Sequence, residues 1–139
     1  MFDPYSFDIS DLVQRHQDVA FTFEYNCDMR RILPWVAMVE TKRAVTEFGF
    51  IWVEVKPGTA VDAHEHDEEE LFLVIAGKGE LEIEGQVTSL TVGDAVYIPR
   101  FWTHQMKNPF EQTLIFADIY WDWKGRNKSQ YLEEKNGHI

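Results

Sequence analysis

Hydrophobic and polar residues alternate in short runs over the middle of the chain, from residue 48 to residue 120. In the clearest run, Leu81 and Ile83 alternate with glutamates, which is the pattern of a strand with one buried face and one face in water. Residues typical of turns separate the runs, glycine above all. The expected strands are 48–55, 71–75, 79–84, 87–92, 95–98, 104–107 and 113–120. Short strands at this regular spacing predict an all-β sandwich or barrel.

The two ends of the chain lack this regular alternation. At 139 residues, the chain fits one domain with a core of its own, and no internal repeat divides it. We therefore expect a single domain over 1–139, made of an entry segment over 1–35, a barrel over about 36–123 and a polar tail over 124–139.

Local patterns add detail to the entry segment and to the start of the barrel. Ser10 and Asp11 can cap a short N-terminal helical segment that runs on to His16. Residues 21–25 alternate as in a strand, and residues 36–39 have the apolar character of one.

One expected strand is apolar on both faces. Alternate residues over Glu70–Val74 share one face, whereas Leu71, Leu73 and Ile75 point the other way and must also leave water. Either a second layer of the same chain or a second subunit has to cover them, and a homodimer is the more economical arrangement. Part of the cover could come from the aromatic residues Phe48, Phe50 and Trp52.

Composition narrows the class of protein. With 45% hydrophobic and 14% aromatic residues, the chain is expected to be globular. No apolar run is long enough to span a membrane, and no signal-peptide pattern opens the sequence, so a cytoplasmic location is expected. The lone Cys27 excludes an internal disulfide. A formal charge of −11 argues against nucleic acid and anionic membranes as partners and leaves a small molecule.

Candidate chemistry is concentrated in the sequence HEHDEEE. His64 and His66 are two residues apart, so on a strand both imidazoles leave the same face. Glu70 follows an acidic turn and can return a carboxylate to the two rings, and His104 can supply a third imidazole from a distant part of the chain. Imidazoles with a carboxylate are a usual ligand set for a first-row transition metal.

These residues resemble the two motifs of the cupin superfamily. The first motif is Gly, five residues, His-x-His, three residues, Glu, six residues, Gly, and it is matched at Gly58, His64, His66, Glu70 and Gly77. The second is matched at Gly93, Pro99, His104 and Asn108, with one departure: Phe101 stands where the family has glycine. The resemblance implies a single double-stranded β-helix, or jelly-roll barrel, of the small metal-binding cupin 2 type.

The ligand set leaves one or two open positions on a five- or six-coordinate metal, where water, dioxygen or substrate can bind. We expect one divalent transition metal per chain, with Fe(II) favoured and Zn, Mn, Ni, Co or Cu as alternatives.

Aromatic and apolar residues around the motifs are candidates for the wall of a substrate cavity. They are Trp52, Phe72, Phe101, Trp102 and Met106. Tyr97, which carries a titratable oxygen, is the candidate general acid or base. Because a phenylalanine is disfavoured at positive φ, the turn at Phe101 is expected to adopt an ordinary conformation. Its ring then either narrows the cavity entrance and selects a flat or apolar ligand, or packs as core.

Three functions remain open. The first is a metal-dependent oxygenase, resembling dioxygenases of this superfamily. The second is a redox-neutral metalloenzyme, such as a polyketide-cyclase-like protein, an isomerase, an epimerase or a decarboxylase. The third is a ligand-binding or sensor cupin without catalysis.

Overall fold

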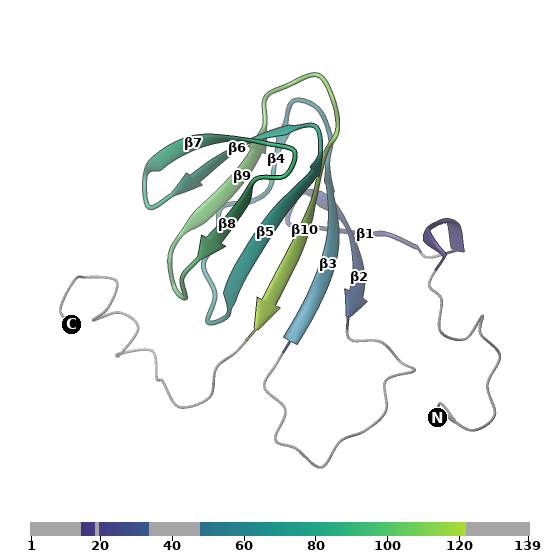
Figure 1. Cartoon of the computed structure of the whole chain (residues 1–139), viewed down its shortest axis with the longest axis horizontal. Helices are drawn as coiled ribbons and strands as arrows, with labels where there is room; N and C mark the ends of the chain where they lie inside the picture. Colours follow the sequence, from purple (N-terminus) through teal and green to yellow (C-terminus); the bar gives the residue numbers. More distant parts are fainter. Residues whose placement is uncertain (1–14, 19, 34–47, 122–139) are drawn as a thin grey trace, which may run out of the picture.

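The computed structural model describes residues 15–18, 20–33 and 48–121. In this part of the chain, two antiparallel sheets face each other and one short 3₁₀ helix, η2 (His16–Asp18), lies at the N-terminal side (Figure 1). The strands are β1 (Thr22–Glu24), β2 (Cys27–Leu33), β3 (Phe48–Val55), β4 (Thr59–Ala60), β5 (Glu69–Ala76), β6 (Lys78–Ile83), β7 (Gln86–Thr91), β8 (Ala95–Ile98), β9 (His104–Asn108) and β10 (Leu114–Trp121). The expected all-β cupin-like barrel is confirmed.

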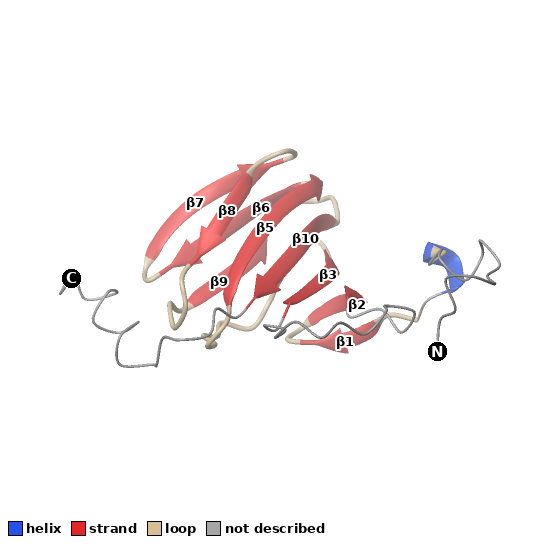
Figure 2. Ribbon diagram, turned by 60° about the horizontal axis from the view of Figure 1, so that its bottom comes forward, coloured by secondary structure: helices blue, strands red, loops and turns tan. Residues whose placement is uncertain are grey.

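The sheets differ in size. The larger has the order β1-β2-β3-β10-β5-β8, and the smaller has the order β4-β9-β6-β7 (Figure 2). Strand β10 lies inside the larger sheet and pairs with β3 on one side and β5 on the other. The chain crosses repeatedly between the sheets, so that residues distant in sequence meet in the space between them.

The core lies between the two sheets. It forms because side chains along each strand alternate between an outward-facing and a buried position. On β3, the even-numbered side chains face outward, whereas Ile51, Val53 and Val55 are buried. On β6, Leu81 is fully buried, as its alternation with glutamates predicted. The apolar side chains of both sheets join in one core cluster that also includes Val74, Ile98 and Met106.

The turn after β5 shows why one motif glycine is needed. Gly77 has a φ of 76°, and a Cβ at this position would lie 2.5 Å from the carbonyl oxygen of Thr113. A side chain would therefore meet both a strained backbone and a steric clash. The residue lets the chain turn sharply from β5 into β6.

The outer face of the larger sheet differs from our expectation. Strands β3 and β5 lie in the same sheet with β10 between them, so Phe48, Phe50 and Trp52 do not cover the apolar face of β5. They face outward on the same sheet surface. Leu73 is 39% exposed and Ile75 is 37% exposed.

The larger sheet also begins earlier in the chain than expected. Strands β1 and β2 fall within residues 1–35, the predicted entry segment, and β2 pairs with β3 along most of its length. The predicted helix start at Ser10, the strand over 36–39 and the tail over 124–139 lie outside the described residues. Within the described residues, no helix is long and apolar enough to cross a membrane.

Candidate metal centre

The predicted ligands come together between the two sheets. His104 begins β9 of the smaller sheet, and His64 pairs with it in an isolated antiparallel bridge. Glu70 belongs to β5 of the larger sheet, and His66 lies in the loop that leads to it. One potential ligand atom from each of these four residues lies within 4.8 Å of all the others. The sequence prediction of a four-residue cluster therefore agrees with the geometry.

Each imidazole is oriented by a backbone carbonyl. The Nδ1 atoms of His64, His66 and His104 lie 2.7, 3.0 and 2.9 Å from the carbonyl oxygens of residues 62, 68 and 102, respectively. A carbonyl oxygen only accepts, so each Nδ1 must carry the proton and donate it. This fixes the tautomer and leaves each Nε2 with its lone pair free for a metal, the second-shell arrangement usual for histidine ligands.

The atoms at the centre of the cluster fit a cation. Glu70 Oε1 lies 2.5 Å from His66 Nε2 and 3.1 Å from His104 Nε2. His104 is buried, and its Nε2 makes no hydrogen bond with any described residue. With Nδ1 protonated, the Nε2 atom of each histidine is a hydrogen-bond acceptor, and so is the Glu70 carboxylate. These acceptors converge, and a metal ion is the partner that satisfies them together. Nitrogen and oxygen donors of this kind accept several divalent transition metals.

The electrostatics of the cluster keep the carboxylate ionised. Burial by itself would raise the pKa of Glu70, but the adjacent His104, His66 and Asp118 side chains lower it well below its ordinary value. Burial lowers the pKa of His64. Burial also acts to lower the pKa of His66, but the hydrogen bond with Glu70 and the charge of that carboxylate outweigh it and raise the pKa.

The turn before His104 fastens the ligand loop. The N–H of Phe101 donates a hydrogen bond to the carbonyl oxygen of His66 at 2.9 Å. Arg100, which is 4% exposed, donates to the carbonyl oxygen of Asp67 and lies 3.8 Å from Glu69. The turn thus holds the loop between His66 and Glu70 in place through hydrogen bonds to the backbone carbonyl oxygens of that loop.

Phe101 adopts the conformation that we expected it to avoid. Its φ is 61°, so the turn keeps the left-handed geometry that a glycine would take there. The expectation of an ordinary conformation is wrong, because the hydrogen bond from Phe101 to His66 holds the backbone in place. The side chain is 9% exposed and is absent from the cavity lining, so it does not narrow the entrance.

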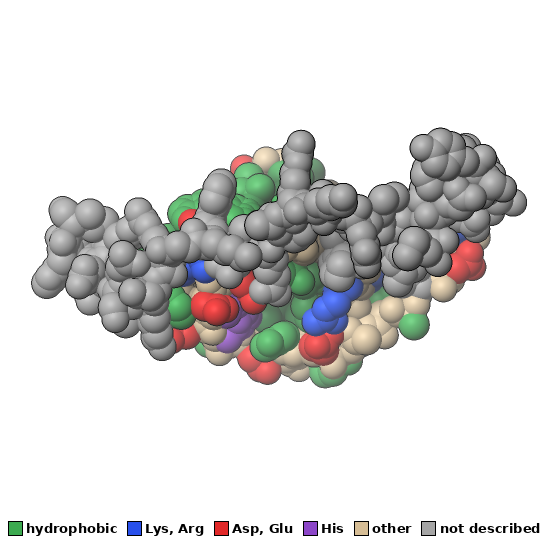
Figure 3. All heavy atoms as spheres, turned by 90° about the horizontal axis from the view of Figure 1, so that it is seen from below, with side chains coloured by type: hydrophobic (Ala, Val, Ile, Leu, Met, Phe, Trp, Pro, Cys, Tyr) green, Lys and Arg blue, Asp and Glu red, His purple; other side chains and the backbone are tan. Residues whose placement is uncertain are grey.

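A cavity of about 240 Å³ adjoins the cluster. Of the predicted wall residues, Phe72 and Met106 line it, and the Phe72 ring lies edge-on to His104 with centroids 6.1 Å apart. The other apolar lining residues are Met29, Ile51, Val53, Val61 and Phe116. Viewed from below, histidine side chains are visible at the surface among acidic and hydrophobic ones (Figure 3).

Three other predicted site residues lie elsewhere. Trp52 faces outward and donates to Glu54 at 2.8 Å, so it is not part of the cavity wall. Trp102 does not line the cavity either, although its carbonyl oxygen orients His104. Tyr97 is 49% exposed on the outer face. It pairs with outward-facing Leu71 in the sheet and does not line the cavity.

The sequence analysis missed one residue of the site, Asp118. It lies on β10, is 8% exposed and lines the cavity. Burial and the neighbouring Glu70 carboxylate raise the pKa of Asp118 well above its ordinary value, whereas the pKa of Glu70 is lowered. The available signal was a single acidic residue on the inward face of an otherwise apolar strand, after Leu114 and Phe116.

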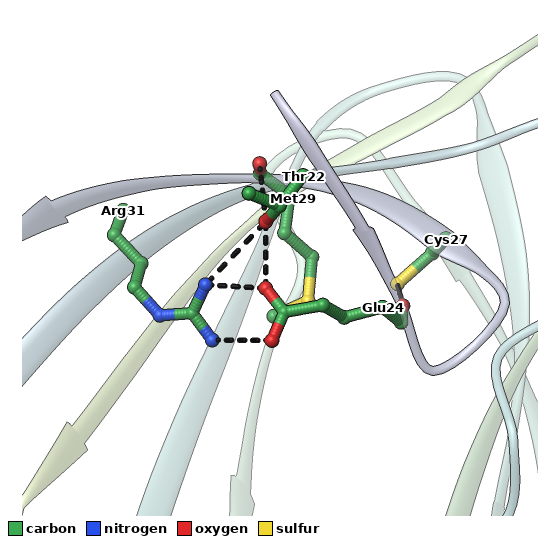
Figure 4. A network of polar contacts seen from close by, with 5 residues as sticks. All are labelled: Thr22, Glu24, Cys27, Met29 and Arg31. Atoms are coloured by element: carbon green, nitrogen blue, oxygen red, sulfur yellow. Dashed lines mark hydrogen bonds and ion pairs between the residues drawn. The ribbon is translucent and has the colours of Figure 1, made fainter. Parts of the chain in front are cut away.

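The end of the cavity formed by β1 and β2 carries a polar network (Figure 4). Arg31 lines the cavity and donates two hydrogen bonds to the Glu24 carboxylate, at 2.5 and 3.1 Å. This pairing lowers the pKa of Glu24 to about 2. Nearby, burial raises the pKa of the Cys27 thiol to about 12, which keeps it protonated and unreactive.

The family follows from the sequence once this geometry is known. Residues 51–120 match the Cupin domain family. This chain is a cupin. The match contains all four candidate metal ligands, and the two-sheet barrel places them as the family resemblance implied.

Two curated relatives match only part of the cupin. A mannose-1-phosphate guanylyltransferase of Salmonella montevideo is 34% identical over 68 residues, which are 48% of this chain and 14% of that protein. An uncharacterized protein of Aquifex aeolicus is 35% identical over 65 residues, 46% of this chain and 54% of the relative. The chain thus spans about half or less of the length of these relatives.

Solved structures match the cupin over most of its length. The plu4264 protein of Photorhabdus luminescens has a TM-score of 0.70 and 27% identity, and the match covers 90% of this chain and 98% of that one. A predicted oxalate decarboxylase of Thermotoga maritima has a TM-score of 0.67 and 20% identity, covering 80% and 99%. A provisionally named sugar phosphate isomerase of Acidithiobacillus ferrooxidans has a TM-score of 0.64 and 20% identity, covering 84% and 78%. The last two show the fold alone.

Proposed function

We propose that this cupin is a metal-dependent enzyme that acts on a small molecule in its cavity, and that the reaction is an oxygenation. The residues that would hold the metal are His64, His66, Glu70 and His104, with Fe(II) as the favoured ion. One observation carries the proposal: three Nε2 atoms and one ionised carboxylate converge at the wall of a cavity large enough for a small ligand.

The protein side chains prepare this centre in three ways. Backbone carbonyls hold each imidazole in one tautomer, so no reorientation is needed when an ion binds. Glu70 contributes one negative charge, which offsets part of the charge of a divalent ion. The apolar wall formed by Phe72, Met106 and Phe116 limits water around the bound molecule. A divalent metal held here would supply either dioxygen activation or Lewis acidity.

An oxygenase is favoured by the ligand count. Four protein ligands leave one or two positions on a five- or six-coordinate iron for the substrate and dioxygen. The test is an oxygen-electrode measurement on Fe(II)-loaded protein with a panel of small hydroxylated and aromatic compounds. We expect oxygen uptake matched by loss of one compound. Neither Zn-loaded protein nor Glu70→Gln loaded in the same way should consume oxygen.

A redox-neutral reaction, such as an isomerisation or decarboxylation, is the second candidate. Asp118 favours it, since a carboxyl group beside the cluster can take part in proton transfer. Turnover by the Zn-loaded protein without oxygen uptake would replace the oxygenase with this function. Binding without turnover under either metal would identify a ligand-binding or sensor cupin.

A further inference from the structure

Arg31 of β2 is the only lysine or arginine among the described residues that line the cavity. It follows Cys27 and Met29 at alternate positions of the strand, and all three line the cavity. It is also opposite Ile51, which is buried on the inward face of β3 and lines the cavity too. Register and lining therefore agree that Arg31 belongs to the inner face of the barrel. Its side chain is 43% exposed, so it lies where the cavity meets solvent.

The ion pair of Arg31 connects it to the side of the cavity that holds the metal cluster. Its partner Glu24 is followed directly by Tyr25, whose ring lies over that of His64 with centroids 5.0 Å apart. Tyr25 and His64 both line the cavity. Strands β2 and β5, with β3 and β10 between them, lie about 14 Å apart at the usual strand spacing. The side chains of Arg31 and Glu70 shorten this distance from its two ends, so a molecule of a few carbon atoms can span the rest.

The guanidinium of Arg31 has hydrogen-bond donors to spare. Its Nη1 and Nη2 atoms donate to the Glu24 carboxylate at 2.5 and 3.1 Å, and Nη1 also donates to the Thr22 hydroxyl at 3.5 Å (Figure 4). An arginine has five N–H donors, so the edge formed by Nε and Nη2 keeps two donors without a partner among the described residues. Such an edge can hold a carboxylate through two parallel hydrogen bonds. Glu24 and Thr22 do not line the cavity, whereas Arg31 does.

The charge of this position selects the kind of group that binds there. Ion pairs between partly exposed side chains add little to stability, so the fold alone does not account for an arginine in the cavity wall. A guanidinium there is suited to an anion. One negative charge fits better than two, because no other described lysine or arginine lines the cavity and Glu24 already shares the charge of Arg31. A carboxylate is therefore favoured over a phosphate dianion.

We propose that Arg31 binds the carboxylate of a small carboxylic acid whose other end reaches the metal cluster. The inference rests on the proposed metal function and narrows its substrate to an acid. Met29 and Ile51 line the cavity beside Arg31 and would contact the carbon atoms between the two ends. The cavity of about 240 Å³ is smaller than the roughly 300–1,000 Å³ typical of sites for drug-sized ligands, so the acid is correspondingly small.

Diacids and their half-amides test the carboxylate site. Succinate and succinamate have the same shape, but only succinate carries a second negative charge. Malonate with malonamate, and glutarate with glutaramate, extend the comparison to a shorter and a longer molecule. Binding to Co(II)-loaded protein is followed by the visible absorption of the ion, so only molecules that reach the cluster are counted. The measured quantity is the ratio of the two dissociation constants, half-amide over diacid, for the pair that wild type distinguishes best.

Three variants separate binding by Arg31 from the other effects of charge. In Arg31→Gln the ratio should fall about fivefold to twentyfold, the loss of one charge-assisted pair. In Glu24→Gln the ratio should rise, because an amide no longer offsets the charge of Arg31. Lys107→Gln is the matched control and should leave the ratio unchanged, since Lys107 pairs with Glu82 on the smaller sheet and does not line the cavity. All three replaced side chains are partly exposed, so the variants should fold.

The opposite directions expected for Arg31→Gln and Glu24→Gln distinguish binding from a structural role. If the pair only held β1 to β2, both variants would lower the ratio, and that result would overturn the carboxylate site. An equal ratio in wild type and Arg31→Gln would overturn it as well and leave the metal centre intact, as would an equal fall in Lys107→Gln. Protein that takes up no Co(II) would overturn the proposed function and the carboxylate site with it.

Discussion

His64 and His104 donate their backbone N–H groups to each other's carbonyl oxygens, at 3.1 and 3.0 Å. The two imidazole rings then lie side by side, with centroids 4.6 Å apart. Because the backbone makes this bridge, the fold itself brings two ligands together, and the imidazoles are not needed to close it. Metal binding and folding should therefore be separable in this protein.

Removal of a ligand imidazole should reduce metal binding while the fold survives. We expect His64→Ala, His66→Ala and His104→Ala each to lower metal affinity by more than the 10–100-fold usual for loss of an outer-shell partner. Metal content is measured by elemental analysis and the fold by circular dichroism. His16→Ala is the matched control, since His16 lies outside the cavity against Trp52 and Phe21. Full metal retention in any of the three ligand variants would remove that residue from the site.

The stability of the metal-free protein should depend on pH through the pair of His66 and Glu70. The pKa of His66 is raised above its ordinary value of 6.5, so the contribution of the pair is complete below that value and is lost as the pH rises through the raised pKa. The pKa of Glu70 is lowered, so the carboxylate stays ionised over this range. As the pH rises above 6.5 and through the raised pKa of His66, wild type should lose unfolding free energy relative to Glu70→Gln.

Urea denaturation of chelator-treated protein measures this difference. Each pKa unit by which the pair raises His66 corresponds to about 1.4 kcal/mol. Parallel pH profiles for wild type and Glu70→Gln would show that the two side chains are not coupled in the folded protein.

Phe101 should show opposing effects of backbone strain and burial. Its φ of 61° is strained for a side chain, by about 1–2 kcal/mol, but its ring is 9% exposed. We expect Phe101→Ala to lose about 3–5 kcal/mol of unfolding free energy, and Phe101→Gly to be more stable than Phe101→Ala by about 1 kcal/mol. Urea denaturation gives both values. Equal stabilities of Phe101→Ala and Phe101→Gly would mean that the backbone relaxes. A change in the affinity for a cavity ligand in either variant would instead place Phe101 at the cavity entrance.

The apolar outer face of β5 should form a homodimer interface. Leu73 and Ile75 are exposed in the single chain, and Tyr97 of β8 pairs with Leu71 on the same face. Light scattering should therefore report about twice 16.3 kDa, and Leu73→Lys should reduce this to one chain. Val87→Lys places the same charge on an exposed residue of the smaller sheet and should leave the dimer intact. A monomeric wild type at micromolar concentration would contradict the interface.

Local patterns in the sequence were enough to predict the metal ligands and most of the strands, although not β2 or β4. The predicted ranges 48–55 and 95–98 match β3 and β8 because alternation is a property of consecutive residues. The ligands were predictable because His64, His66 and Glu70 lie close together in sequence and because the fixed motif spacing points to His104.

Long-range register accounts for the errors. The position of Tyr97 depends on its pairing with Leu71, and no local pattern reveals on which face that pair lies. Phe101 was assigned an ordinary φ from its intrinsic preference, which a tertiary hydrogen bond to His66 overrides. Asp118 was overlooked because its neighbours in space, Glu70 and Phe72, are distant in sequence.

Metal content of the protein, purified without a chelating column, tests the central claim most directly. We expect about one divalent transition metal per chain in wild type, since four donors converge there. Glu70→Gln, purified in the same way, should contain markedly less. Wild-type protein that carries no metal, and that takes up none when Fe(II), Mn(II) or Zn(II) is added, would contradict the account.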